Sequence, residues 1–138
     1  MNRYVDASVV LRRLFRQPDA LSSWDEIDGG FASRLMVVEC LRTLDRLVVR
    51  GHLTIAQGIE GRTAVHRIAT CLSIVEPVRR ILEAAAGPSP APLGTLDAIH
   101  LATAIALRDD GATDIDIATH DAELAAAARA MGFETVGA

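Results

Sequence analysis

The sequence has no lysine, and all 14 of its basic residues are arginine. Every mechanism that requires a lysine side chain is therefore excluded. Aromatic residues are scarce as well, with three Phe, one Tyr and one Trp among 138 residues. Because half of the residues are nevertheless hydrophobic, the core must consist mainly of Ala, Val, Ile and Leu. This composition excludes a disordered chain and predicts a single packed domain over residues 1–138.

Long apolar runs and a signal segment are also missing. Arg, Asp or Glu interrupts every apolar stretch before the roughly 18 residues that a membrane-spanning helix needs. Asp6 comes too early for the apolar region of a signal peptide, so we expect a cytoplasmic protein without a membrane segment. Cys40 and Cys71 lack the CxxC spacing of a zinc site, and we expect both to be small buried residues in a reducing compartment.

Strand and helix patterns alternate along the chain. Apolar and polar residues alternate from Asp114 to Thr119, as in a strand, whereas apolar residues recur at helical spacing before Gly51. The patterns predict strands at 3–5, 30–33, 72–75, 114–119 and 133–136, and helices at 8–15, 20–27, 35–50, 54–70, 77–86, 95–108 and 122–131. Strands separated by helices pair in parallel, so we expect an α/β fold: a three-layer α/β/α sandwich with a parallel sheet of about five strands.

Two aspartates lie where a predicted strand passes into a helix. Asp6 follows the first strand, and Asp121 follows the strand at 114–119. Both positions fall at the carboxyl edge of a parallel sheet, where binding sites form if the strand order reverses. Aspartate is also favoured at helix N-caps, so position alone leaves both interpretations open.

Two further acids occupy unusual places within helices. Glu39 is the only acid between Asp28 and Asp45, in an apolar helix start. Burying its carboxylate without a partner is costly, so either an i,i+3 pair with Arg42 or a metal or catalytic role must compensate. Asp97 lies in a first turn, where the helix dipole favours an acid. It also opens a helix of small residues directly behind a proline-rich loop, which would place it in a cleft.

These four acids converge on one edge of the predicted sheet. Carboxylates held within a few ångströms repel one another and raise each other's pKa unless a cation is present. Hard oxygen ligands suit Mg²⁺ or Mn²⁺, and a water on such an ion can become a nucleophile. The sequence therefore predicts a divalent metal site formed by Asp6, Glu39, Asp97 and Asp121.

The four acids lie in sequence blocks that resemble the PIN-domain family. The blocks are residues 4–8 (YVDAS), 38–39 (VE), 96–104 (LDAIHLATA) and 118–124 (ATHDAEL), in the family order over nearly the whole chain. The third block is the most diagnostic, and the length is similar to that of VapC toxins. The resemblance implies a PIN-like α/β/α fold and a Mg²⁺- or Mn²⁺-dependent endoribonuclease. It assigns Asp6, Glu39 and Asp97 as core acids, Asp121 as the fourth and Thr119 as a supporting residue.

The resemblance also implies partners. VapC-type toxins of toxin–antitoxin pairs cleave RNA and commonly form homodimers. A small DNA-binding antitoxin of the VapB type holds them inactive, with its tail across the catalytic groove. The amphipathic helices over residues 35–70 could supply that groove, although core packing explains the same pattern.

The net charge of −4 conflicts with RNA as a substrate, because nucleic-acid binders usually carry a basic excess. A local rim of arginines would resolve the conflict by contacting phosphates. A solvated helix face is the simpler explanation of the same residues. The candidates for this rim are Arg12, Arg13, Arg16, Arg34 and Arg42.

The sequence also raises other roles for the histidines and other functions for the chain. The four histidines lack zinc-site spacing, so packing or surface roles are favoured, although His100 lies one turn after Asp97 and could contact substrate. A phosphoacceptor receiver domain shares the α/β pattern but needs the lysine that this chain lacks. A non-catalytic interaction module with PIN architecture would keep the fold without using a metal.

Overall fold

The computed structural model describes residues 2–18, 20 and 27–138. The predicted helix over residues 20–27 lies mostly outside this part of the chain. The described residues form five strands and six helices. Along the chain they are β1 (Asn2–Val5), α1 (Ala7–Leu14), β2 (Phe31–Ser33), α2 (Arg34–Val49), α3 (Ile55–Thr70), β3 (Ser73–Val75), α4 (Arg79–Ala85), α5 (Thr95–Asp109), β4 (Ile115–Ala118), α6 (Ala122–Ala130) and β5 (Thr135–Val136).

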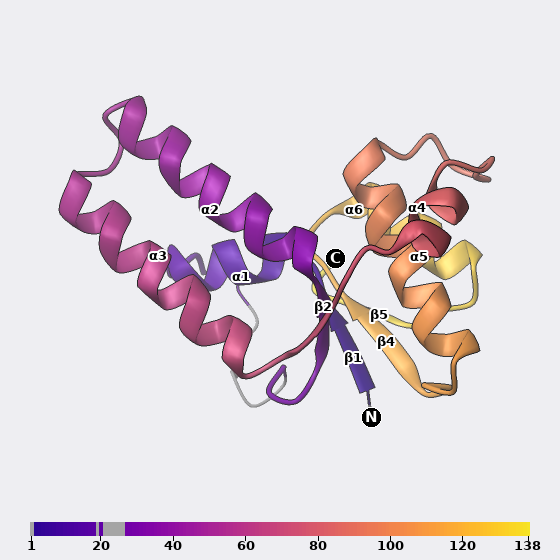
Figure 1. Cartoon of the computed structure of the whole chain (residues 1–138). Helices are drawn as coiled ribbons and strands as arrows, with labels where there is room; N and C mark the ends of the chain where they lie inside the picture. The colour runs from indigo at the N-terminus through magenta and orange to yellow at the C-terminus, as the bar shows by residue number, and fades with distance from the viewer. Residues whose placement is uncertain (1, 19, 21–26) are drawn as a thin grey trace.

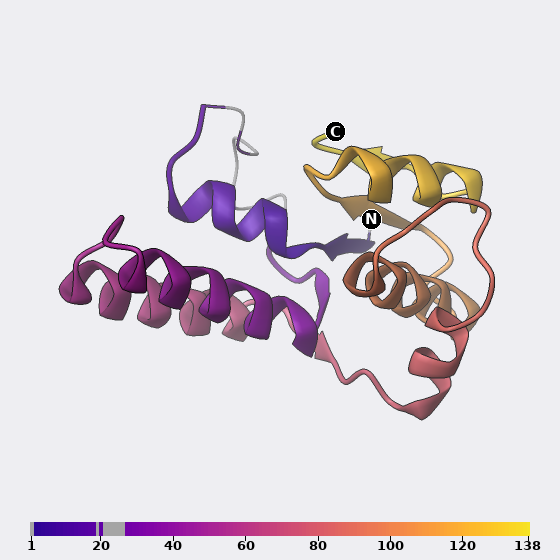
Figure 2. The same cartoon turned by 90° about the horizontal axis from the view of Figure 1, so that it is seen from above.

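The five strands form one parallel sheet in the order β3-β2-β1-β4-β5. Helices α1, α2 and α3 lie to one side of the strands, with α2 and α3 as a long hairpin, and α4, α5 and α6 lie to the other (Figure 1; Figure 2 shows the same arrangement from above). The predicted α/β/α sandwich with a parallel sheet is therefore confirmed. The chain runs outward from β1 to β3 and then returns to β4, so the strand order reverses between β1 and β4.

The central strands bury both of their faces. Tyr4 pairs with Ile117 and Val5 with Ala118 across β1 and β4, and all four residues are at most 1% exposed. Val5 and Ala118 belong to the core cluster under α1, α2 and α3, whereas Tyr4 and Ile117 belong to the cluster under α5 and α6. Strands with helices on both faces are fully buried in this way, which fixes the carboxyl ends of β1 and β4 side by side.

Local signals explain where the long hairpin helices begin and end. Ser33 caps α2 by accepting a hydrogen bond from the backbone of Leu35. Thr54 and Gln57 form a reciprocal capping box at the start of α3, as the predicted Thr54 cap requires. Gly51 has φ +78°, a conformation that favours glycine, so the chain turns directly after α2.

Some predicted boundaries are wrong. Pro77 lies outside α4, because the Val78 N–H donates to the Glu76 carbonyl in a local turn and the helix begins only at Arg79. Phe133 is not part of β5, because its N–H donates a hydrogen bond to the Ala128 carbonyl at the end of α6. Cys40 is buried as expected, but Cys71 is exposed.

None of the helices in the described residues is both long enough and apolar enough to cross a membrane.

Candidate metal centre

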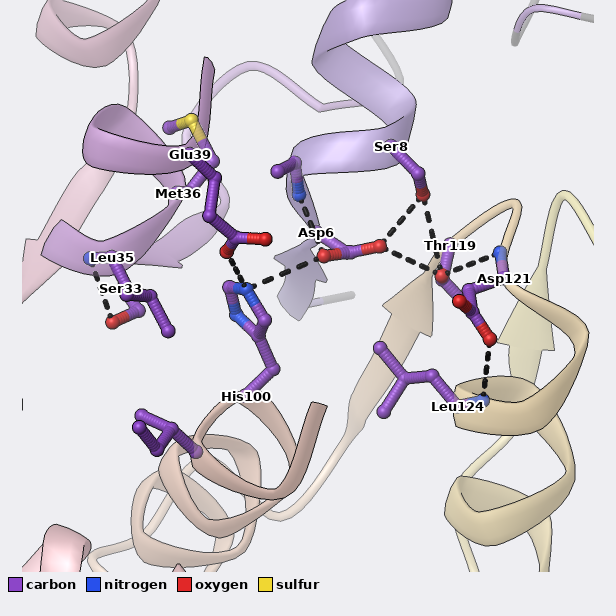
Figure 3. Close-up of polar contacts among 12 residues, drawn as sticks. Asp6, Ser8, Ser33, Leu35, Met36, Glu39, His100, Thr119, Asp121 and Leu124 are labelled. Carbon is purple, nitrogen blue, oxygen red and sulfur yellow. Dashed lines mark hydrogen bonds and ion pairs between the residues drawn. The ribbon is translucent and has the colours of Figure 1, made fainter. Parts of the chain in front are cut away.

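Asp6 lies at the carboxyl end of β1 and is only 4% exposed. Its Oδ1 accepts a hydrogen bond from the Ala7 backbone at 2.7 Å, which makes it the N-cap of α1. Its Oδ2 accepts hydrogen bonds from Ser8 Oγ at 2.6 Å and Thr119 Oγ1 at 2.9 Å. Three donors thus fix a buried carboxylate, and the capping role does not remove Asp6 from the site (Figure 3).

Glu39 reaches the same place from the second turn of α2. Its Oε1 lies 2.5 Å from His100 Nε2, and its side chain is 22% exposed. Arg42 does not pair with it, because the Arg42 guanidinium donates to Asp45 at 2.9 Å instead. The i,i+3 explanation for Glu39 is therefore wrong, and a buried histidine from α5 provides its partner.

His100 lies at the centre of the acids, 1% exposed. Its Nδ1 is 2.6 Å from the Tyr4 hydroxyl, and its Nε2 is 3.4 Å from Asp6 Oδ1. Burial lowers the pKa of His100, but the hydrogen bond with Glu39 and the nearby carboxylates raise it overall. The sequence alone favours an ordinary packing role for this histidine. Its place three residues after Asp97, on the same face of α5, suggested a substrate contact, but no local pattern predicts its contacts with Glu39 and Tyr4.

Asp6, Glu39 and His100 each direct a possible ligand atom to one point, and these atoms lie within 4.8 Å of one another. The three residues come from the end of β1, from α2 and from α5 (Figure 3). Two carboxylates in such a small volume suit a hard divalent cation such as Mg²⁺ or Mn²⁺. The donor set therefore fits the predicted metal.

Asp97 lies in the first turn of α5 and is half-buried. Burial and the charges of Asp121, Asp6 and Glu39 raise its pKa to about 6, while His100 opposes the shift. The other three predicted acids thus all act electrostatically on Asp97. Ionised Asp97 is therefore disfavoured in this setting, and a bound cation would relieve the repulsion.

Asp121 caps α6, since its Oδ1 accepts from the backbones of Glu123 at 2.8 Å and Leu124 at 3.0 Å. Its own N–H donates to Thr119 Oγ1 at 3.0 Å. The Thr119 hydroxyl donates in turn to Asp6, so Thr119 links the ends of β4 and β1. Asp121 therefore reaches Asp6 only through Thr119 and acts on Asp97 through its charge, while it also stabilises the start of α6.

Ser8 also contacts Asp6, and the sequence did not predict this residue as part of the site. Its hydroxyl donates to Asp6 and accepts a hydrogen bond from the His120 backbone at 2.9 Å. A serine two residues after an N-cap aspartate is a local hydrogen-bonding pattern, which is the signal that could have identified it.

The arginines of the predicted rim occupy different surroundings. Arg34 forms an exposed pair with Glu76 at 2.7 Å, and Arg42 pairs with Asp45. Arg12 and Arg13 lie in the last turn of α1, and Arg16 follows that helix with φ +51°. Asp6 caps the opposite end of α1. At the helical rise per residue, Arg13 lies about 10 Å from Asp6 along the helix axis. Phosphate contacts by these arginines stay a prediction.

Comparisons with known proteins agree with this architecture. The family model for the PIN domain matches residues 3–130. The chain is 30% identical over 136 residues to Ribonuclease VapC46 of Mycobacterium tuberculosis (strain ATCC 25618 / H37Rv), covering 96% of this chain and 95% of that protein.

Two solved structures share the fold at low sequence identity. One is VapBC2 from Rickettsia felis bound to a DNA fragment from their promoter, with a TM-score of 0.63, 10% identity and coverage of 99% of this chain and 98% of that one. The other is PAE2754 from Pyrobaculum aerophilum, with a TM-score of 0.63, 14% identity and coverage of 99% and 90%.

Proposed function

This chain belongs to the PIN-domain family, and on that premise we propose that it is a VapC-type toxin that hydrolyses RNA phosphodiester bonds with Mg²⁺ or Mn²⁺. The observation that carries the proposal is the convergence of Asp6, Glu39 and His100 at the reversal of strand order, with Asp97 and Asp121 acting on the same centre. The curated relative at 30% identity is named a ribonuclease, which supports the same activity.

The proposed ligands are Asp6, Glu39, Asp97 and Asp121, with Thr119 as the supporting residue. When bound, the divalent ion would orient the scissile phosphate, activate a water and neutralise developing charge. Asp6 enters this role already fixed by the Ala7 backbone, Ser8 and Thr119. Asp97, whose pKa is raised to about 6, can hold a proton when no cation is bound.

The products would be a 5′-phosphate and a 3′-hydroxyl. The experiment that tests the activity incubates purified protein with total RNA in Mn²⁺, Mg²⁺ or EDTA, beside Asp6→Asn and a matched control, Glu83→Gln on the exposed surface of α4. We expect cleavage by the wild type and Glu83→Gln only with metal, and at least a hundredfold loss in Asp6→Asn, on the order of the effects of removing one charge-stabilising group.

A non-catalytic interaction module is the alternative. It predicts no metal-dependent cleavage by any variant, so the same experiment separates the two functions. Cleavage that persists unchanged in Asp6→Asn would point to a contaminating nuclease and would contradict the proposed site.

We further propose that a VapB-like antitoxin covers the toxin. One structural neighbour is a VapBC2 assembly, which supports such a partner. On the α2–α3 hairpin, packing explains buried residues such as Leu44 and Val65, but Val49, Ile55 and Ile59 are more than 60% exposed. These side chains provide an apolar surface for a partner chain. Homodimer formation and the single-domain organisation stay predictions.

A further inference from the structure

A chain of three side chains forms the deepest part of the metal centre. Tyr4 of β1, His100 of α5 and Glu39 of α2 are joined by contacts of 2.6 Å and 2.5 Å through the two ring nitrogens of His100. Tyr4 is 0% exposed and His100 is 1% exposed. Neither side chain can therefore contact an RNA substrate, and a role for them must act through Glu39 or Asp6.

The partners of the His100 ring determine where its hydrogen lies. An ionised carboxylate can only accept hydrogen bonds, so Nε2 must carry the hydrogen that joins it to Glu39. If the ring is neutral, Nδ1 accepts from the Tyr4 hydroxyl. If the ring is charged, Nδ1–H donates to the Tyr4 oxygen. With an ionised Glu39, Nε2 carries a hydrogen in both cases, so in the metal-free protein this nitrogen has no free lone pair.

The same nitrogen lies between two acids that come from different elements. It is 2.5 Å from Glu39 Oε1 and 3.4 Å from Asp6 Oδ1. The Tyr4 ring meets the His100 ring edge to face, with centroids 5.8 Å apart. Tyr4 thus holds the imidazole from one side, and the imidazole holds the Glu39 carboxylate beside Asp6.

We propose that His100, fixed by Tyr4, is a positioning residue that donates Nε2–H to Glu39 and orients this carboxylate toward Asp6, rather than a metal ligand itself. The inference rests on the proposed function, because it assigns a role within the same site. Residues that orient ligands from outside typically contribute roughly 10- to 100-fold to metal affinity or activity.

The first test needs no metal. In metal-free protein with ¹⁵N-labelled histidine, the ring spectrum of His100 should show a hydrogen on Nε2, and Tyr4→Phe should shift the Nδ1 resonance because its partner is lost. A ring that carries its hydrogen on Nδ1 alone, with Nε2 unprotonated, would overturn the assignment.

The second test measures Mn²⁺ affinity. His100→Leu removes the donor and should weaken binding by roughly 10- to 100-fold. His100→Gln keeps an N–H at the side-chain end and should recover most of the affinity. Tyr4→Phe should weaken binding less than His100→Leu, since the ring stays in place. His66→Gln, an exposed histidine of α3, is the matched control and should bind as the wild type.

Pulsed electron paramagnetic resonance of bound Mn²⁺ separates a positioning residue from a ligand. We expect no coupling to a coordinated imidazole nitrogen in the wild type. A nitrogen coupling that disappears in His100→Gln would show direct ligation and contradict the proposal. If His100→Leu does not fold, Tyr4→Phe provides the test. Mn²⁺ affinity in Tyr4→Phe equal to that of the wild type, together with nitrogen coupling in the wild type, would equally overturn the proposal.

These measurements also distinguish the two proposals. A wild type that binds no Mn²⁺ would contradict the proposed metal-dependent function. The ring spectrum would still show whether His100 Nε2 donates the hydrogen bond to Glu39. Metal-dependent RNA cleavage together with unchanged Mn²⁺ affinity in His100→Leu would contradict only the positioning role.

Discussion

At the scale of single residues, the surroundings of Asp97 disfavour its ionised form. Its pKa is raised from 3.8 to about 6 by burial first and then by Asp121 and Asp6. The folded state therefore binds the proton more tightly than the unfolded chain does. Below the unfolded pKa both states are protonated and no penalty exists. As the pH rises from about 4 through about 6, the metal-free fold loses stability.

Asp97→Asn should remove this penalty. In EDTA at about pH 8, we expect the variant to melt at a higher temperature than the wild type, and the difference should shrink toward about pH 4. Saturating Mn²⁺ should reverse the order, because a ligand at 100 times its dissociation constant stabilises a binding-competent fold by about 2.7 kcal/mol. Asp109→Asn, at the far end of α5, is the control. An equal response of wild type and Asp97→Asn to Mn²⁺ would exclude Asp97 as a ligand.

The residues of the centre differ in how far the sequence predicted them. The acids carry local signals, since Asp6 and Asp121 follow strands and Glu39 interrupts an apolar helix. His100 carries none, because a histidine inside an apolar helix is usually a packing residue. Its role depends on contacts with Tyr4 and Glu39, which are 96 and 61 residues away in sequence. Only the tertiary arrangement creates that signal.

At the scale of elements, an ion pair between the buried Asp116 and the partly buried Arg3 joins β1 to β4. Arg3 and Asp116 are register partners, and Arg3 Nε and Nη2 donate to the two carboxylate oxygens of Asp116 at 2.8 and 2.7 Å. The alternating pattern correctly predicted a strand here, but it did not predict how its polar residues are accommodated. All four residues of β4 are buried, and Arg3 is what compensates the Asp116 charge.

Arg3→Met should destabilise the protein by about 3–5 kcal/mol, because it leaves a buried carboxylate without its partner. The double variant Arg3→Met with Asp116→Leu should recover most of the loss, since it removes both charges. Urea unfolding in EDTA measures both, with Arg80→Met as a control because the Arg80–Asp110 pair is exposed. A double variant no more stable than Arg3→Met would show that packing rather than the unpaired charge accounts for the loss.

Close packing within the α2–α3 hairpin is a feature that helical periodicity does not predict. The sequence predicted both helices and the Thr54 cap, but not how closely the helices approach. A Cβ on Gly58 would lie 2.6 Å from Val48 Cγ2, and one on Gly61 would lie 2.9 Å from Leu44 Cδ2. Glycine within a helix costs about 1 kcal/mol relative to alanine, and here close packing against α2 offsets that cost.

At the scale of the whole molecule, the strand order decides where the chemistry lies. The sequence predicted parallel strands but not the order β3-β2-β1-β4-β5, because local periodicity does not record which strands become neighbours. That order brings the ends of β1 and β4 together. As a result, Asp6 and Glu39 come from elements on one side of the molecule, and Asp97, His100 and Asp121 come from the other.

A cation bound to acids from both sides should therefore join the two halves of the fold. We expect Mn²⁺ to slow amide hydrogen exchange together in the first turns of α1 and α5 and around Glu39 in α2, because binding suppresses the local openings that separate these elements. The far end of the hairpin, residues 49–55, carries none of the acids and should not change. Hydrogen-exchange mass spectrometry of the wild type and Asp97→Asn, with and without Mn²⁺, measures this. Protection confined to α1 and α2 in the wild type would mean that the metal is held by one half alone, and it would exclude Asp97 from the site.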